Sequence, residues 1–404
     1  MKVLLSALGC EPEKGSELEV GFQTMLAAAS KHDVWVLTNA GTLAATKRVV
    51  EAGPFADRIR LIGIPFGVSA EDFARLSVPG FHVHYDRWQR KAAQVAVELD
   101  REVDFDLVHH ATLASYWTRA GVAAVDKPFV LGPVGGGVDP PLQLLPVLGP
   151  RGMLGDAARV LTRHVLGHVA PAATAQRRAV VTFAQNEATA GRLLGRGRVI
   201  VLSNALSADM QHVQAQSKRT SDLVFAGRLI PWKAPILALR AFRYVNNSAC
   251  VLHFCGEGPE QTRLERAAAQ WGLTDRVRFN GWLPRHELLG LVAEAGALIH
   301  PALHEEAGLC VAEALALRTP VICLDHGGPA ELLREWPGGQ GAAVPVRGPT
   351  STARAMAAAI DGFLARSPVQ TSNITTGVEQ FSREILAAYE YACGYVTVRS
   401  RASG

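Results

Sequence analysis

The chain has 404 residues, of which 48% are hydrophobic and 19% are charged. These proportions are those of a folded globular protein and exclude a disordered chain, and the length suits two domains of about 200 residues each. The 41 basic and 37 acidic residues leave a net charge of only +4, which excludes the strongly basic surface typical of nucleic-acid-binding proteins.

The chain begins with a short apolar run that has the composition of a buried strand. The run follows Lys2 and is too short for the apolar part of a secretory signal. No segment approaches the ~18 apolar residues of a membrane-spanning helix. The six cysteines form neither a CxxC pair nor a regular framework. We therefore expect a soluble protein of the reducing cytoplasm, without a disulfide scaffold or a zinc site.

Continuous apolar runs in the first half predict the strands of a parallel sheet. They are residues 2–7, 33–38, 58–63, 105–110, 128–132 and 179–184. Strands that helices cover on both faces have such unbroken runs, and helix-like segments such as residues 20–31 separate them. This alternation predicts a doubly wound α/β domain.

The same pattern returns in the second half, where the runs are residues 222–227, 249–256, 276–281, 296–301 and 319–325. We expect an N-terminal domain at residues 1–211, a polar linker at 212–221, a C-terminal domain at 222–375 and a terminal helix within 376–404. Ligands of open parallel sheets bind at the carboxyl ends of the strands, so the loops after the strands are the places to seek functional residues.

The most informative segment follows the run that ends at His300. It contains Glu305 and Glu313, which seven residues separate, and Gly308 between them, before an apolar helix. A helix N-terminus offers backbone N–H groups and a positive dipole to a diphosphate. Glu313 suits a ribose diol and Glu305 suits sugar hydroxyls; the alternative is that both glutamates only stabilise the helix dipole.

Two cations, Arg228 and Lys233, follow the first strand of the same domain. At the carboxyl end of the sheet they would neutralise a diphosphate leaving group; the alternative is that they are solvated surface charges. A turn with Gly256 and Gly258 follows the next strand and is weak evidence alone. Together, these features at one edge of one sheet favour a nucleotide site.

These segments resemble the retaining glycosyltransferases of the two-domain GT-B fold, family four. GRLIPWK, with Arg228 and Lys233, is similar to the family's diphosphate-binding segment, and HEEAGLCVAEA, with Glu305 and Glu313, is similar to its E-x7-E motif. The resemblance covers essentially the whole chain and is strongest over residues 223–333. It implies two doubly wound domains that face across a cleft, with a nucleotide-sugar donor on the C-terminal domain, an acceptor on the N-terminal domain and a last helix that crosses back to the latter. It also implies that two residues of the E-x7-E segment, Gly308 and Leu309, contact the donor.

The N-terminal half resembles the family more loosely. The loop after the first strand corresponds to one that approaches the donor phosphates, here through Gly15 and Ser16. The family's His-x-His at a strand end is replaced by the adjacent pair His109 and His110. Both are assigned to the acceptor side; we expect His110 to face the cleft as a catalytic residue, while His109 packs.

A glycine run and one departure from the family concern the two sugars. Gly135 and Gly136, in the segment PVGGGV, would allow close backbone approach on the acceptor side; a flexible turn is the alternative. After the first glutamate the family usually has a glycine and an aromatic residue, whereas this chain has Glu306 and Ala307. The surroundings of the donor sugar are therefore altered.

Residues 151–200 form a basic stretch with eight arginines and two acidic residues. Leu161, Val165 and Val169 have helical spacing there, and Arg159 and Arg163 are four residues apart. A basic amphipathic helix can lie on an anionic membrane, which would place a cytoplasmic protein at the inner face of the membrane. The alternative is a helix packed on its own sheet with its arginines in solvent.

The sequence thus predicts a retaining glycosyltransferase that moves a sugar from a nucleoside-diphosphate sugar to a hydroxyl acceptor, such as a glycan, a lipid-linked sugar or a small natural product. Arg228, Lys233, Glu305 and His110 are the expected catalytic residues, and neither a metal nor a cofactor is expected. Alternatives are a nucleotide-sugar epimerase or hydrolase of the same fold, and a non-catalytic nucleotide-sugar-binding subunit. A dinucleotide dehydrogenase is disfavoured, because no GxGxxG opens either domain's first helix.

Overall fold

The computed structural model describes residues 1–12, 16–68, 78–169, 171–205, 219–336, 340–365 and 377–402. The chain forms two compact units: an N-terminal unit of Met1–Gly137, Thr162–Leu206 and Gly377–Gly404, and a C-terminal unit of Val138–Leu161 and Ser207–Thr376. Residues 138–161 therefore belong with the second half of the chain, and its last residues belong with the first half. The expected linker at 212–221 lies mostly outside the described residues.

The N-terminal unit is built on a parallel sheet whose described strands have the order β3-β2-β1-β4-β5-β6-β7. The strand order reverses between β1 and β4, as in a doubly wound sheet. The strands are β1 (Lys2–Ala7), β2 (Asp33–Asn39), β3 (Ile59–Ile64), β4 (Leu107–Thr112), β5 (Phe129–Val134), β6 (Val181–Ala184) and β7 (Arg198–Val201).

Alternating side chains give this sheet two apolar faces. Val3 and Leu5 of β1 lie in one core cluster, whereas Leu4 lies in another. The first cluster includes α1 (Ser16–Ala29) and α14 (Val378–Ala402), and the second includes α4 (Val78–Val103). The other helices are α2 (Leu43–Glu51), α6 (Ala172–Arg178), α7 (Glu187–Ala190) and the short 3₁₀ helix at Gly121–Ala124. Burial of both faces explains the unbroken apolar runs in the sequence.

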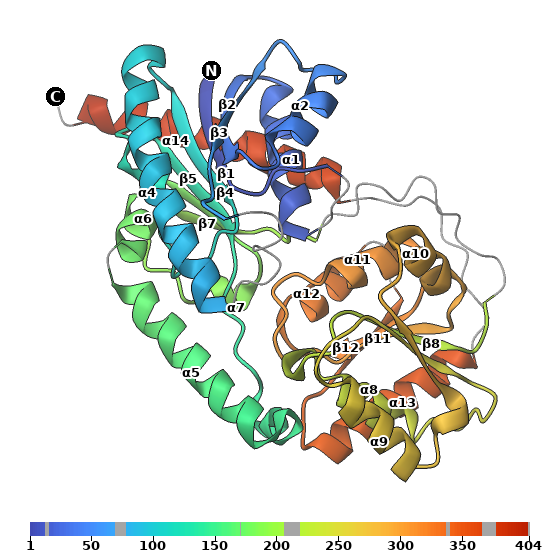
Figure 1. The fold of residues 1–404 in the computed structure, drawn as a ribbon. Coiled ribbons are helices and arrows are strands. Elements are labelled where there is room, and N and C mark those ends of the chain that lie inside the picture. Colours follow the sequence, from blue (N-terminus) through green and yellow to red (C-terminus); the bar gives the residue numbers. More distant parts are fainter. Residues whose placement is uncertain are drawn as a thin grey trace. The chain divides into compact units, whose positions relative to one another are not determined.

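The last helix packs on the first one: Figure 1 shows α14, in red, passing beside α1, in blue. The hydroxyl of Tyr389 in α14 lies 2.7 Å from Nδ1 of His109 in β4, and Nε2 of His109 lies 2.7 Å from the carbonyl oxygen of Gly132. A carbonyl only accepts, so Nε2 carries the hydrogen and Nδ1 accepts from Tyr389. This bond joins the end of the chain to the centre of the first sheet.

The C-terminal unit contains a second parallel sheet, and its described strands have the order β10-β9-β8-β11-β12-β13. The strands are β8 (Leu223–Ala226), β9 (Leu252–Cys255), β10 (Val277–Gly281), β11 (Ala297–His300), β12 (Val321–Leu324) and β13 (Gly341–Val344). The helices are α8 (Pro235–Phe242), α9 (Gln261–Gln270), α10 (Arg285–Glu294), α11 (Leu309–Ala316), α12 (Gly327–Glu335) and α13 (Pro349–Leu364), with 3₁₀ turns at Pro231–Lys233 and Thr274–Arg276. The predicted fold class, α/β with two doubly wound sheets, is confirmed.

A segment from the first half of the chain completes the core of the C-terminal unit. The 3₁₀ helix at Leu142–Leu148 inserts Leu144 and Leu148 among the side chains of that core. Arg263 of α9 donates to the carbonyl oxygen of Val147 at 3.1 Å. These contacts explain why residues 138–161 belong to this unit rather than to the predicted N-terminal domain.

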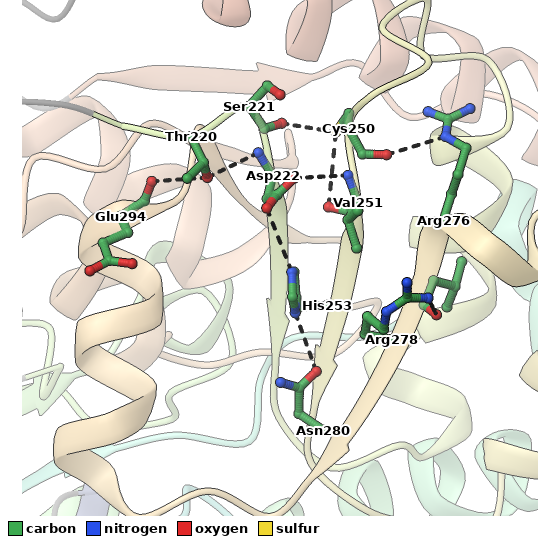
Figure 2. A network of polar contacts seen from close by, with 11 residues as sticks. Thr220, Ser221, Asp222, Cys250, Val251, His253, Arg276, Arg278, Asn280 and Glu294 are labelled. Atoms are coloured by element: carbon green, nitrogen blue, oxygen red, sulfur yellow. Dashed lines mark hydrogen bonds and ion pairs between the residues drawn. The ribbon is translucent and has the colours of Figure 1, made fainter.

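A polar network joins the amino ends of β8 and β9 (Figure 2). Asp222, just before β8, accepts from the backbone N–H of Val251 at 2.9 Å, and its other carboxylate oxygen lies 3.8 Å from His253. His253 in turn lies 3.3 Å from the amide oxygen of Asn280 in β10. The network thus ties three strands together, from the start of β8 through β9 to the second half of β10.

The helix α5 (Gly149–His168) turns charged residues toward the protein. The side chain of Arg163 is only 6% exposed and donates to the carbonyl oxygen of Gly136 at 2.9 Å. Arg159 pairs with the buried Asp156 and stacks over the ring of Trp232, 5.2 Å from its centroid. The alternative of a helix with its arginines in solvent does not describe Arg163, which is buried, and Arg159 is only 31% exposed.

The opposite face of α5 exposes apolar side chains. Leu154 is 76% exposed and Leu161 is 66% exposed. Further exposed apolar residues of, or just after, this helix are Met153, Val165, Leu166 and Val169. The helix is amphipathic, as its spacing predicts, but its apolar face is exposed to solvent and its charged face packs against the protein. None of the helices in the described part of the chain combines the length and apolarity that crossing a bilayer requires.

Candidate functional site

The candidate site lies where the strand order of the second sheet reverses. β8 and β11 are neighbours, while β9 and β10 continue on one side and β12 and β13 on the other. The loops that leave the carboxyl ends of two such strands diverge, and ligands of doubly wound sheets bind in the space they leave. Arg228 and Lys233 follow β8, and Glu305 and Gly308 follow β11, so the structure brings both parts of the predicted site to this point.

The loop after β8 is held by the turn after β9. The backbone N–H of Leu229 donates to the carbonyl oxygen of Glu257 at 2.8 Å, and the backbone N–H of Glu260 donates to the carbonyl oxygen of Leu229 at 3.0 Å. Gly258 has φ +155°, and a Cβ there would lie 2.3 Å from the carbonyl oxygen of Leu229. Glycine is required at this position because two backbones approach too closely for any side chain.

Arg228 and Lys233 lie in different surroundings. Arg228 is exposed, and no carboxylate within the described residues forms an ion pair with it. Lys233 ends the 3₁₀ turn before α8, and its Nζ forms an ion pair with Glu305; each side chain is 19% exposed. Burial would lower the pKa of Lys233, but the Glu305 carboxylate raises it above its usual value. Lys233 is therefore a cation held by an ion pair, and Arg228 is a solvent-exposed one.

The loop that carries Glu305 is locked to the start of α12. The backbone N–H of Gly328 donates to the carbonyl oxygen of Glu305 at 3.2 Å. A Cβ at Gly328 would lie 1.9 Å from the carbonyl oxygen of Glu306, so only glycine fits. The carboxylate of Glu306 accepts from the backbone N–H of Val138 at 3.3 Å. The unusual Glu306 thus holds a neighbouring segment of the same unit.

Beyond its pair with Lys233, Glu305 faces a histidine that the sequence analysis did not single out. Nε2 of His300 lies 3.5 Å from Glu305, and Nδ1 lies 3.3 Å from Sγ of Cys310. Burial would raise the pKa of Glu305, but Lys233 and His300 outweigh it and lower the pKa to about 2. Burial would lower the pKa of His300, but Cys310 and Glu305 raise it to about 9. At neutral pH the carboxylate therefore lies between two cations.

Glu313 lies in the second turn of α11 and is only 8% exposed. One of its oxygens lies 2.7 Å from Nη1 of Arg285 at the start of α10. Burial raises the pKa of Glu313, although Arg285 opposes the rise. Arg285 was missed in the sequence because nothing in the order of residues places the start of α10 against α11.

The N-terminus of α11 completes the arrangement. Gly308 caps the helix in a left-handed conformation, with φ +85°, and Leu309 is the first helical residue. The first backbone N–H groups of a helix have no acceptors within it and form an anion site with the dipole. With Arg228 and Lys233, the N-terminus of α11 places positive charge at this edge of the sheet, and Glu305 adds a carboxylate.

The predicted residues of the N-terminal unit lie at the carboxyl end of the first sheet. His109 and His110 are both buried, on opposite faces of β4. Nε2 of His110 lies 3.2 Å from the hydroxyl of Tyr85, and its Nδ1 lies 3.3 Å from that of Ser6. Burial lowers the pKa of His109 to about 4 and that of His110 to about 3. Both rings are neutral and partnered, and the catalytic role of His110 stays a prediction.

The glycine run after β5 is tightly held rather than a flexible turn. Gly135 donates to the carbonyl oxygen of Ala114 at 3.0 Å, and Gly136 accepts from Arg163 at 2.9 Å. Gly136 has φ +100°. The close approach expected here is made to the chain's own segments, and the acceptor-side role of both glycines is a prediction.

The loop after β1 holds the remaining predicted residues. Gly15 lies outside the described residues, and Ser16 is the first residue of α1. The next residue, Glu17, was not singled out: its carboxylate accepts from the side chain of Asn204 at 2.7 Å and from the backbone N–H of Leu113 at 2.9 Å. An acidic residue directly after a glycine and a serine was the only available signal.

Comparison with known families locates the match in the second half of the chain. Residues 209–371 match the family described as Glycosyl transferases group 1. The chain is 40% identical over 73 residues to a 2-deoxystreptamine glucosyltransferase of Streptomyces kanamyceticus, covering 18% of this chain and 19% of that protein. It is 28% identical over 308 residues to a D-inositol 3-phosphate glycosyltransferase of Frankia alni, covering 70% and 68%. The chain thus spans about a fifth of one relative's length and about two thirds of the other's.

Solved structures share the fold over almost the whole chain. Anabaena HepE in complex with UDP and glucose matches with a TM-score of 0.54 and 17% identity, covering 98% of this chain and 100% of that chain. A sucrose-phosphate synthase from Thermosynechococcus elongatus matches with a TM-score of 0.57 and 17% identity, covering 100% of each. Residues 209–371 thus match the glycosyl transferases group 1, and the fold shared with the solved structures extends over almost the whole chain.

Proposed function

We propose that the protein is a retaining glycosyltransferase of family four that transfers a sugar from a nucleoside-diphosphate sugar to a hydroxyl acceptor. The observation that carries the proposal is the convergence of Lys233, Glu305 and the N-terminus of α11 where the second sheet reverses its strand order. The family match of residues 209–371 supports the same activity.

The proposed mechanism assigns the leaving group to the cations. Arg228, Lys233 and the first N–H groups of α11 would stabilise the negative charge that develops on the departing diphosphate. Glu305 would hold the donor sugar, and it orients Lys233 through their ion pair. The acceptor hydroxyl would attack on the face that the diphosphate leaves and give it the proton, which retains the anomeric configuration without a covalent nucleophile.

Since protein cations supply the positive charge, we propose that transfer needs neither a metal nor a cofactor. Activity should survive EDTA treatment, followed as product formed per unit time. Complete loss on chelation, restored by added Mg²⁺, would contradict the assignment of Arg228 and Lys233 to the diphosphate.

UDP-glucose is the first donor to test, because Anabaena HepE shares the fold and binds UDP and glucose. In a thermal-shift panel of UDP-, GDP-, ADP- and dTDP-sugars, we expect the sugars of one base only to raise the melting temperature. At a hundredfold excess over Kd, the bound sugar should add about 2.7 kcal/mol to the free energy of unfolding. Product analysis by NMR with and without acceptor then decides the reaction. Conversion of the donor alone would indicate an epimerase or hydrolase, and binding without turnover would indicate a binding subunit.

Replacing Glu305 and Glu313 should have different effects on nucleotide binding and on turnover. Glu313→Gln should weaken binding of the free nucleoside diphosphate, because a ribose contact serves ground state and transition state alike. Glu305→Gln should lower kcat with little change in nucleotide affinity, because the free nucleoside diphosphate lacks the donor sugar that Glu305 is proposed to hold. Calorimetric titration of nucleoside diphosphate into both variants separates these roles; equal weakening would contradict them.

We also propose that the exposed apolar face of α5 lies on an anionic membrane surface. Among the described residues of α5 the single acid, Asp156, is buried and paired, whereas Arg151 and His168 are exposed beside the apolar residues. Such a face buries side chains at the headgroup level and attracts anionic lipid.

Sedimentation with vesicles tests this contact. The protein should sediment with vesicles that contain phosphatidylglycerol and not with pure phosphatidylcholine. The double variant Leu154→Ser, Leu161→Ser should no longer sediment with these vesicles, and its melting temperature should equal that of the wild type. Equal sedimentation of the variant would overturn the proposal.

A further inference from the structure

Cys310 differs from the other cysteines of the chain in its surroundings. Cys10, Cys250, Cys255 and Cys323 are buried, and only Cys310 and Cys393 are partly exposed. Burial raises the pKa of Cys393, whose sulfur lies 3.9 Å from the carbonyl oxygen of Asp106. Cys310 instead lies in the first turn of α11, within the candidate donor site.

A buried histidine is aimed at the sulfur of Cys310. His300 is 3% exposed, its Nδ1 lies 3.3 Å from Sγ, and its Nε2 lies 3.5 Å from Glu305. The thiol, the imidazole and the carboxylate therefore lie in a row, and Glu305 at its end forms an ion pair with Lys233. His300 thus directs Nδ1 at the sulfur, while the carboxylate of Glu305 on the other side of the ring favours its protonated form.

The N-terminus of α11 lies beside the same sulfur, because Cys310 is in the first turn of this helix. An adjacent imidazolium and a helix N-terminus both stabilise negative charge on sulfur. The thiolate is the form that attacks disulfides, peroxides and alkylating reagents. A modified Cys310 would also place a bulky group at the N-terminus of α11, where the diphosphate is proposed to bind.

We propose that Cys310 is a reactive thiol, activated by His300, whose covalent modification blocks the donor site. With hydrogen peroxide the thiolate sulfur attacks one oxygen, the O–O bond breaks, and the products are a sulfenic acid and hydroxide, which takes a proton to form water. Sulfur loses two electrons and the peroxide gains them. The reactivity of Cys310 stands independently, whereas the block rests on the proposed function.

Iodoacetamide labelling followed by peptide mass spectrometry tests the reactivity, with Cys393 as the control within the same molecule. In this reaction a C–S bond forms and iodide leaves. At pH 7 Cys310 should react at least tenfold faster than Cys393 in the folded wild-type protein. His300→Gln should slow Cys310 about tenfold and leave Cys393 unchanged. Equal rates of the two thiols in the wild type would overturn the activation by themselves, even if the variant failed to fold.

Protection by UDP tests the position of the thiol. Saturating UDP should slow labelling of Cys310 at least fivefold and leave Cys393 unchanged, and Cys310→Ser should make donor binding resistant to peroxide. If calorimetry shows that UDP binds and Cys310 is still labelled at the same rate, the block is wrong. If none of the nucleoside diphosphates binds, the proposed function fails, while the ratio of labelling rates still decides the activation.

Discussion

Arg228 and Lys233 carry the same charge in different surroundings, and their replacement should separate catalysis from stability. Arg228→Ala removes an exposed group and should lower kcat/KM by about 100- to 1,000-fold with an unchanged melting temperature. Lys233→Ala should cause a similar loss and also destabilise the C-terminal unit by about 3 kcal/mol, because the partly buried Glu305 loses one of its two cationic partners.

Kinetics with the best donor and thermal denaturation provide the two measurements. Arg266→Ala is the control, since Arg266 is an exposed residue of α9. Wild-type turnover in both site variants would remove the diphosphate assignment. Equal melting temperatures of the Arg228 and Lys233 variants would contradict the contrast in their surroundings.

His300 should make the stability of the protein depend on pH. Its folded pKa is raised to about 9 from an ordinary value of 6.5, so the stabilisation from its charge is complete below pH 6.5 and is lost as pH rises through 9. The neighbours that face the ring are Cys310 and Glu305, and Lys233 faces Glu305. Between pH 6.5 and 9.5 the melting temperature of the wild type should fall more than that of His300→Gln. Parallel curves would show that the ring carries no charge.

Among the described strands, the central ones and the edge strands β3 and β10 were predictable from the sequence, whereas two edge strands were missed. The apolar runs predict β1 to β6 and β8 to β12 within a few residues. The missed strands, β7 and β13, are the outer strands at one end of each described sheet, and their side chains are mostly exposed or half-buried. An edge strand has a neighbour on one side only, so its sequence needs no unbroken apolar run.

The site was predictable where one loop carries the signal. The glutamates, Lys233 and the helix start follow from motif spacing, and the structure brings them together. The contacts of Arg285 with Glu313 and of Cys310 with His300 join residues from different elements, and a single sequence by itself holds no record of such pairs. The helix α5 shows a related limit: apolar spacing defines two faces, but only tertiary packing decides which face is buried.

Because α5 buries an arginine and exposes its leucines, replacing the arginine should destabilise the protein more than replacing a leucine. Arg163→Ala should destabilise the N-terminal unit by about 1–3 kcal/mol, because the carbonyl oxygen of Gly136 loses its buried donor. Leu161→Ala should change stability by less than about 0.5 kcal/mol, because the side chain is 66% exposed. Chemical denaturation of both variants provides the comparison. The reverse order, with leucine costing several kcal/mol, would indicate an ordinary amphipathic helix.

Each unit of the whole molecule has its own core. One cluster of buried side chains fills the C-terminal unit, and two others lie on the two faces of the first sheet. Units with separate cores need not unfold in one step. Calorimetry should therefore resolve two transitions, and a nucleoside diphosphate should raise the one that belongs to the C-terminal unit, which carries the candidate donor site.

The bond between Tyr389 and His109 provides a way to assign these transitions. Tyr389→Phe keeps the ring but leaves Nδ1 of the buried His109 without its donor, at a cost of about 1–3 kcal/mol. For a unit of this size the transition should fall by about 2–12 °C. Tyr391→Phe is the matched control, because that residue lies in the same helix and is 39% exposed. Only the transition that the nucleotide does not raise should move. A fall of the nucleotide-sensitive transition instead would show that the last helix stabilises the C-terminal unit as well.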